Sequence, residues 1–155
     1  MTGTVHAQPE TGRECPYLAD RWCNKCGWVS TVPRTWVIEM PAGMELLNAN
    51  DRSGHWGRRK RLTEELRAAA GWLAKGQRIP RLERAHVLGI YEPPDRRRRD
   101  PSNYLPSFKA CIDGIVQDAG VLSDDDAAHV DGPDMRLGSV HPGGRLILII
   151  TEVTG

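Results

Sequence analysis

The sequence predicts an α+β domain with a small, mostly antiparallel sheet and two main helices, in the order β-α-β-α-β-β. Two stretches in which apolar residues recur every three or four positions indicate the helices. Shorter alternating or apolar runs on either side of them are typical of strands. Turns rich in glycine and proline separate these segments, and the chain contains no internal repeat that would indicate a solenoid.

The first half of this pattern is a strand, a loop and a helix. Residues 34–40, RTWVIEM, alternate between polar and apolar side chains and predict a strand. Residues 41–54 contain glycine, asparagine and serine, which predict a long turn-rich loop. From about residue 57 to residue 75 the apolar spacing predicts an amphipathic helix with a basic first turn. Trp36 and Trp72 fall within these apolar patterns and are expected in the core.

A strand and the second helix follow. Residues 84–91, RAHVLGIY, predict a mostly buried strand that two prolines end. The second helix is expected to begin at Asn103 as its N-cap, with Pro106 in the first turn, where a missing backbone donor is tolerated. Gly120 supplies its C-terminal stop.

Two further strands are expected at the carboxyl end of the chain. Residues 144–153, GRLILIITEV, are strongly typical of a strand, and residues 135–140 are a weaker candidate before it. Residues 1–33 are rich in glycine, proline, cysteine and charge, so they are expected to form an extension. The main domain is then expected to cover residues 34–155.

Charge is segregated along the chain, although the formal net charge is only +1. Basic residues crowd residues 52–67 and 96–99, whereas acidic residues gather between 113 and 134. So small a net charge gives no global attraction to nucleic acid, and any affinity must come from these local patches. No apolar run is long enough to cross a bilayer, and the amino terminus lacks the apolar core of a secretory signal. We therefore expect a cytoplasmic protein with no membrane partner.

Four consecutive arginines lead directly into Asp100, and three aspartates follow the second predicted helix, Asp124, Asp125 and Asp126. Arginine binds phosphate oxygens through a planar fork of donors, and clustered carboxylates suit hard divalent cations. Together the two groups predict phosphodiester chemistry. Taken alone, each has a simpler interpretation, the arginines as a solvated loop and the aspartates as a polar turn.

Three segments, PDRRRRDPSN, KACIDGIVQDAGVLSDD and GGRLILIITE, occur in an order and spacing that resemble the RusA family of Holliday-junction resolvases. The resemblance covers roughly residues 35–155. It implies a RusA-like fold and a homodimer that binds four-way DNA junctions. It also implies Mg²⁺ or Mn²⁺ as the cofactor for paired symmetric nicks, and a bacterial, phage or prophage origin.

Carried over position by position, the resemblance implies catalytic roles for Asp100, Lys109 and Asp125. Asp100, Asp124 and Asp125 would hold Mg²⁺, and Lys109 would stabilise charge that develops on the phosphate. Trp56, before the first helix, is the tryptophan expected to stack on DNA bases. Contacts to nucleic acid are expected from basic and polar residues near the site and on the first helix, namely Arg96, Arg97, Arg98, Arg99, Asn103, Arg58, Arg59 and Lys60.

Ser102 stands where the family carries its second catalytic aspartate, so a non-catalytic protein that binds DNA junctions is an alternative function. Asp113, one helical turn beyond Lys109, offers a substitute carboxylate, although the same spacing suits a lysine–aspartate pair without a catalytic role. Asp100 and Asp125 belong to opposite ends of a helix roughly 25 Å long. These two aspartates can therefore meet in one site in either of two ways. The segment after the helix turns back within one chain, or a two-fold dimer brings Asp100 of one chain to Asp125 of the other.

The N-terminal extension carries a separate hypothesis. Cys23 and Cys26 form a C-x-x-C-G knuckle of the kind that binds zinc, Cys15 lies eight residues before it, and His6 is the nearby histidine. A Zn²⁺ site with three cysteines and one histidine is one interpretation, and unligated cysteines are the other. A zinc-stabilised interaction module without affinity for junctions is the third functional hypothesis.

Overall fold

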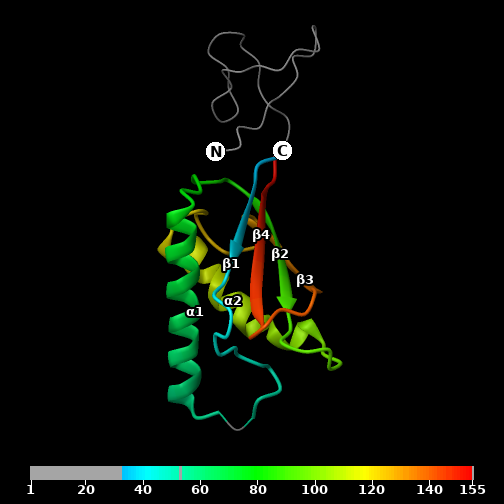
Figure 1. The fold of residues 1–155 in the computed structure, drawn as a ribbon. Helices are drawn as coiled ribbons and strands as arrows, with labels where there is room; N and C mark the ends of the chain where they lie inside the picture. The colour runs from blue at the N-terminus through cyan, green and yellow to red at the C-terminus, as the bar shows by residue number, and fades with distance from the viewer. Residues whose placement is uncertain (1–32, 53, 155) are drawn as a thin grey trace, which may run out of the picture. The chain divides into compact units, whose positions relative to one another are not determined.

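Four strands form one mixed sheet in the order β1-β4-β2-β3 in the computed structural model, which describes residues 33–52 and 54–154 (Figure 1). β4 pairs antiparallel with both β1 and β2, whereas β3 pairs parallel with β2 at the edge. Two helices complete the α+β class, so the predicted class and the mostly antiparallel sheet are confirmed. The strands are β1 (Thr35–Glu39), β2 (Ala85–Glu92), β3 (Val130–Leu137) and β4 (Arg145–Glu152).

The first helix, α1, covers Trp56–Gly76, which confirms the helix predicted for residues 57–75. The second helical segment is continuous but changes its geometry along its length. It begins as the 3₁₀ turn η1 (Pro101–Tyr104), continues as α2 (Leu105–Asp113) and ends as the π-helical turn η2 (Gly114–Asp118). Every helix within the described residues is too short or too polar to span a bilayer.

The predicted N-cap at Asn103 was wrong, because Asn103 lies inside η1. Asp100 is the cap, and its Oδ1 accepts a hydrogen bond from the backbone N–H of Ser102 at 2.9 Å. Pro101 follows the cap directly, where its fixed φ suits a helix start and no donor is needed. At the other end Gly120 has a φ of +68°, a conformation that glycine adopts without strain, and the predicted stop is confirmed.

β3 begins at Val130, earlier than the predicted strand at residues 135–140. The strand contains Gly132 and Pro133, a pair that normally indicates a turn. Because proline has no N–H to donate, it is tolerated on an edge strand, which is the position of β3 in this sheet. The pairing with β2 shifts register beside these residues. The position of β3 at the edge therefore explains why its sequence does not resemble a buried strand.

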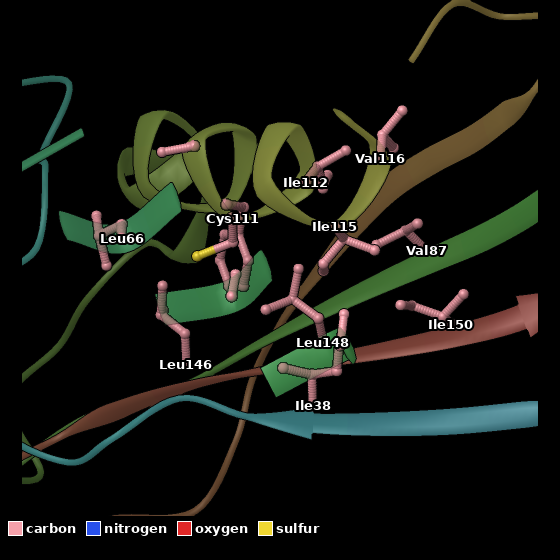
Figure 2. Close-up of a cluster of buried hydrophobic side chains, with 14 of the residues drawn as sticks. Ile38, Leu66, Val87, Cys111, Ile112, Ile115, Val116, Leu146, Leu148 and Ile150 are labelled. Carbon is pink, nitrogen blue, oxygen red and sulfur yellow. The ribbon is translucent and has the colours of Figure 1, made fainter. Parts of the chain in front are cut away.

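The core lies between one face of the sheet and the second helical segment. Ile38, Val87 and Leu148 extend from three neighbouring strands toward Ile112 and Ile115 (Figure 2). Burial of apolar surface stabilises a fold by roughly 25 cal/mol per Å², so this packing fixes the helical segment on the sheet. The contact positions the part of the chain that carries Lys109 and Asp113.

The two helices approach each other at a pair of glycines. A Cβ added to Gly114 would lie 2.1 Å from the carbonyl oxygen of Arg67, and one added to Gly71 would lie 2.9 Å from the carbonyl oxygen of Gly114. Both distances are too short for non-bonded atoms, so only glycine permits this backbone contact. Beside the crossing, the guanidinium of Arg67 donates to both carboxylate oxygens of Asp118, at 2.9 and 2.7 Å.

Trp72 is 75% exposed, so the prediction that it lies in the core was wrong. The buried face of α1 carries Leu66, Ala70 and Ala74, which follow the four-residue step of a helix. Trp72 lies two positions from Ala70 and two from Ala74, which places it on a different face. Trp36 packs partly buried against the core, as predicted.

Ser107 joins the loop after β1 to α2. Its buried hydroxyl donates to the carbonyl oxygen of Leu47 at 2.8 Å and accepts from the N–H of Leu47 at 2.7 Å. Both backbone groups of Leu47 therefore depend on one side chain for their hydrogen bonds. This attachment holds the loop against the start of the second helical segment.

Replacing Ser107 with alanine is expected to lower the free energy of unfolding by about 1–3 kcal/mol, because two buried backbone groups lose their partner. Urea denaturation followed by circular dichroism measures the change. Ser139→Ala is the matched control, since Ser139 is exposed, and its effect is expected to stay within about 0.5 kcal/mol. Equal losses in the two variants would show that the Ser107 hydrogen bonds contribute nothing specific.

Candidate functional site

Lys109 and Asp125 are 16 residues apart in the sequence and form a direct ion pair. The Lys109 ammonium also lies 3.6 Å from a carboxylate oxygen of Asp113, one turn further along α2. The carboxylate of Asp125 also acts electrostatically on that of Asp113. Thus one lysine and two carboxylates converge at the end of α2, and we call these three residues the Lys109 cluster.

The charges of the Lys109 cluster influence one another. The hydrogen bond from Lys109 lowers the pKa of Asp125, and the same bond raises the pKa of Lys109. Partial burial raises the pKa of Asp113, and its carboxylate neighbour adds to this effect, while the nearby lysine opposes it. The two carboxylates therefore differ, because Asp125 holds the closer contact with the ammonium. Additional positive charge placed between the two carboxylates would stabilise the ionised form of each and lower its pKa.

The other two aspartates of the acidic run organise the turn instead of facing Lys109. Asp124 Oδ1 accepts a hydrogen bond from the N–H of Asp125 at 2.8 Å. Asp126 Oδ1 lies 2.5 Å from His129 Nδ1 and accepts from the N–H of Ala128 at 3.0 Å. The interpretation of the run as a polar turn thus applies to Asp124 and Asp126, while Asp125 belongs to the Lys109 cluster.

Asp100 lies at the other end of the second helical segment, where hydrogen bonds from the side chain and backbone of Ser102 lower its pKa. In the described part of the chain, no three His, Cys, Asp or Glu side chains are arranged as a group that could hold a metal ion. Within one chain, Asp100 therefore does not join Asp124 and Asp125 as a set of metal ligands. Closure of the site across a dimer stays a prediction.

Of the four arginines of the run, Arg97 and Arg99 pair with Asp95, and the other two have no partner among the described residues. Arg99 Nη1 and Nη2 donate to the two carboxylate oxygens of Asp95, at 2.5 and 3.1 Å, and the N–H of Arg97 donates to Asp95 at 2.9 Å. Arg96 and Arg98 are exposed and make no hydrogen bond or ion pair with any described residue. Asp95 was not among the predicted site residues, although its spacing of four residues from Arg99 is a usual signal of such a pair.

Replacing Arg99 with glutamine is expected to return the pKa of Asp95 from about 2 toward the ordinary aspartate value of about 3.9. The hydrogen bond from Arg99 is the main cause of the low pKa, with the N–H of Arg97 second. Because the folded-state pKa is depressed, the stabilisation is present above pH 4 and is lost as the pH falls toward 2. Carboxyl carbon shifts of Asp95 measured by NMR down to pH 3 test this. An unchanged titration in the variant would contradict it.

The basic residues of α1 are mostly engaged with neighbours. Arg58 pairs with Glu45 and lies 3.4 Å from Asp51. Lys60 lies 5.5 Å from the centre of the Trp56 ring, and the guanidinium of Arg59 donates to the carbonyl oxygen of Asp51 at 3.3 Å. Trp56 is 78% exposed, as its predicted role in stacking requires. Ion pairs this exposed are weak, so a phosphate can compete for these side chains.

The cysteine hypothesis concerns residues outside the described part of the chain, His6, Cys15, Cys23 and Cys26, and stays a prediction. No protein-family model matches the sequence, and no curated protein matches it.

Proposed function

We propose that this chain is a metal-dependent endodeoxyribonuclease that resolves four-way DNA junctions. The observation that carries the proposal is the contact between Lys109 and Asp125. The resemblance to RusA resolvases assigns both residues to catalysis, and they lie against each other although 16 residues separate them. Asp113 places a second carboxylate beside the same lysine, whereas an isolated surface ion pair contains only one carboxylate.

The donor set of the Lys109 cluster suits a hard divalent cation. Asp113 and Asp125 both present carboxylate oxygens to the Lys109 ammonium, and proteins usually hold Mg²⁺ through one or two carboxylates, waters and substrate phosphates. When bound, the ion would neutralise phosphate oxygens and lower the pKa of an attacking water. Mn²⁺ accepts the same oxygen ligands.

The other residues bind and orient the DNA strand. The Lys109 ammonium donates hydrogen bonds to a phosphate oxygen and stabilises the charge that develops there. Arg96 and Arg98, which have no partners among the described residues, bind neighbouring phosphates through their planar donors. Asp124 holds the backbone of Asp125 and thereby fixes the direction of its carboxylate.

The proposal includes a homodimer in the cytoplasm of a bacterium, or one encoded by a phage or prophage. A four-way junction presents two equivalent strands, and a two-fold dimer places two identical sites on them. The dimer would also bring the Asp100 of one chain to the acidic turn of the other.

Incubation of the full chain with a labelled immobile four-way junction and Mg²⁺ tests the function. Paired nicks on opposite strands are expected, and EDTA is expected to abolish them. The second candidate, a non-catalytic junction binder, is favoured by Ser102 and by its hydrogen bonds to Asp100. It predicts a shifted band in a native gel without any nick.

Replacing Asp100 with asparagine distinguishes its role as a cap from a role as a metal ligand. Asparagine is as good an N-cap as aspartate, so the stability is expected to stay within about 0.5 kcal/mol of the parent chain. If Asp100 acts as a ligand, removal of its charge is expected to lower the nicking rate by at least about 10²-fold with junction affinity unchanged. Nicking at the parent rate would show that Asp100 is not a metal ligand and that the catalytic residues are those of the Lys109 cluster.

A further inference from the structure

A pocket of about 300 Å³ has walls from segments that are distant in the sequence and includes Pro94, which precedes the arginine run. Tyr91 comes from β2 and Tyr104 from η1, while Met44, Leu46 and Asn48 come from the loop after β1. The pocket therefore combines apolar and aromatic side chains with polar groups, among them one amide side chain and the backbone of Gly143 and Gly144. This volume is at the small end of the range for ligand pockets and suits a flat ring system.

We propose that this pocket binds one unstacked nucleobase of a branched or single-stranded DNA. The proposal rests on the proposed function and names the part of the substrate that the protein recognises apart from the phosphates. No paired base inside a duplex can enter such a pocket, whereas a base at an open branch point is already partly unstacked.

The two tyrosines form an aromatic wall. Their ring centres lie 4.0 Å apart with an angle of 33° between the ring planes. Tyr91 is buried and fixes the position of the half-buried Tyr104. Bases stack on aromatic side chains whatever their sequence, because every base has a π face.

The loop after β1, which contributes Met44, Leu46 and Asn48 to the pocket, is held in place by η1. The N–H of Ala49 donates to the carbonyl oxygen of Asn103 at 2.8 Å, and the amide of Asn50 donates to the side chain of Asn103 at 3.0 Å. Asn48 Oδ1 accepts from the N–H of Asn50 at 2.8 Å, while the Asn48 NH₂ group has no partner among the described residues. This NH₂ group is a donor available to a carbonyl of the base.

The arginine run begins two residues after Pro94, which lines the pocket. Among its members, Arg99 acts electrostatically on Tyr91 of the pocket and is itself paired with Asp95. Arg96 and Arg98 remain unpaired within the described residues, two and four positions from Pro94. An aromatic pocket that the arginine run follows closely in the chain suits a nucleotide, which joins a flat ring to a phosphate. An uncharged apolar ligand would use only the pocket.

Fluorescence anisotropy of the full chain in EDTA tests this pocket without cleavage. The probes are two labelled oligonucleotides of equal length, one entirely abasic and one abasic except for a single central thymine. The parent chain is expected to bind the thymine probe about tenfold more tightly, the range of one base–aromatic stack. Tyr104→Ala is expected to abolish this preference, and Tyr104→Phe, which retains the ring, is expected to keep it.

Two further variants complete the test. Met44→Trp fills the pocket and is expected to abolish the preference even if Tyr104→Ala does not fold. Trp72→Ala removes an exposed tryptophan from α1 and is expected to retain the preference in full. Equal affinity of the parent chain for the two probes would contradict the proposal that the pocket binds a base. It would not contradict the proposal that the chain binds DNA. Failure to bind either probe or a four-way junction would overturn the proposed function as well.

Discussion

Under the proposed function, replacing Asp125 with asparagine is expected to lower the rate of junction nicking by about 10³-fold or more, because it removes charge that pairs with Lys109 and that would hold the cation. Affinity for the junction, measured by gel shift in Ca²⁺ or EDTA, is expected to stay near that of the parent chain. The reason is that the proposed phosphate contacts come from arginines elsewhere. The Lys109–Asp125 pair is half exposed on the lysine side, so its loss alone is expected to change the stability little.

Asp126→Asn is the matched control for this prediction. Asp126 is the next residue in the chain, but its carboxylate binds His129 and backbone N–H groups instead of Lys109. The variant is expected to nick junctions at nearly the parent rate. Equal loss of activity in both variants would indicate that the acidic turn acts only as a structural element. Full activity in Asp125→Asn would remove Asp125 from the catalytic assignment.

Replacing Gly114 with alanine is expected to lower the free energy of unfolding by about 3 kcal/mol or more, the upper range for overpacking in a core. The added Cβ would lie 2.1 Å from the carbonyl oxygen of Arg67, and this obstacle is backbone, not a flexible side chain. The two helices must separate to accept it. A decrease in Tm of about 10 °C corresponds to this loss in a chain of this size.

Gly57→Ala controls for the change of residue type. Gly57 lies in the first turn of α1, and a Cβ added there has no atom within 4 Å. Alanine is favoured over glycine in helices, so this variant is expected to be neutral or more stable by up to about 1 kcal/mol. Thermal unfolding followed by circular dichroism compares the two. Similar Tm values for both variants would contradict close backbone contact between α1 and η2.

The elements of the fold were predictable because their signals are local. The alternation around Ile38 and the helical spacing of Leu66 and Ala70 depend on residues only a few positions apart. The limits of α1 and β4 agree with the prediction to within about one residue, closer than the usual difference between assignment methods. By contrast, β3 was placed too late, since the Gly132-Pro133 pair is acceptable only on an edge strand, and position in a sheet is not local information.

The candidate site was predictable only in part. The resemblance to RusA resolvases selects Lys109 and Asp125, which the structure brings into contact. It also selects Asp100, which in one chain is hydrogen-bonded to Ser102 away from that pair. The wall formed by Tyr91 and Tyr104 has no signal in the sequence, because strand and helix residues that are 13 positions apart meet only through the packing of η1 on β2.

The sequence by itself determined the class of fold, the kinds of its elements and the residue types available for phosphate and cation chemistry. Apolar periodicity and charge are properties of neighbouring residues, so they can be recognised without coordinates. Only the tertiary structure decided that β3 pairs parallel with β2, that Trp72 is exposed and that Asp125, but not Asp124 or Asp126, contacts Lys109. These outcomes depend on contacts between distant segments, which are selected by the packing of the whole core and not by any local pattern.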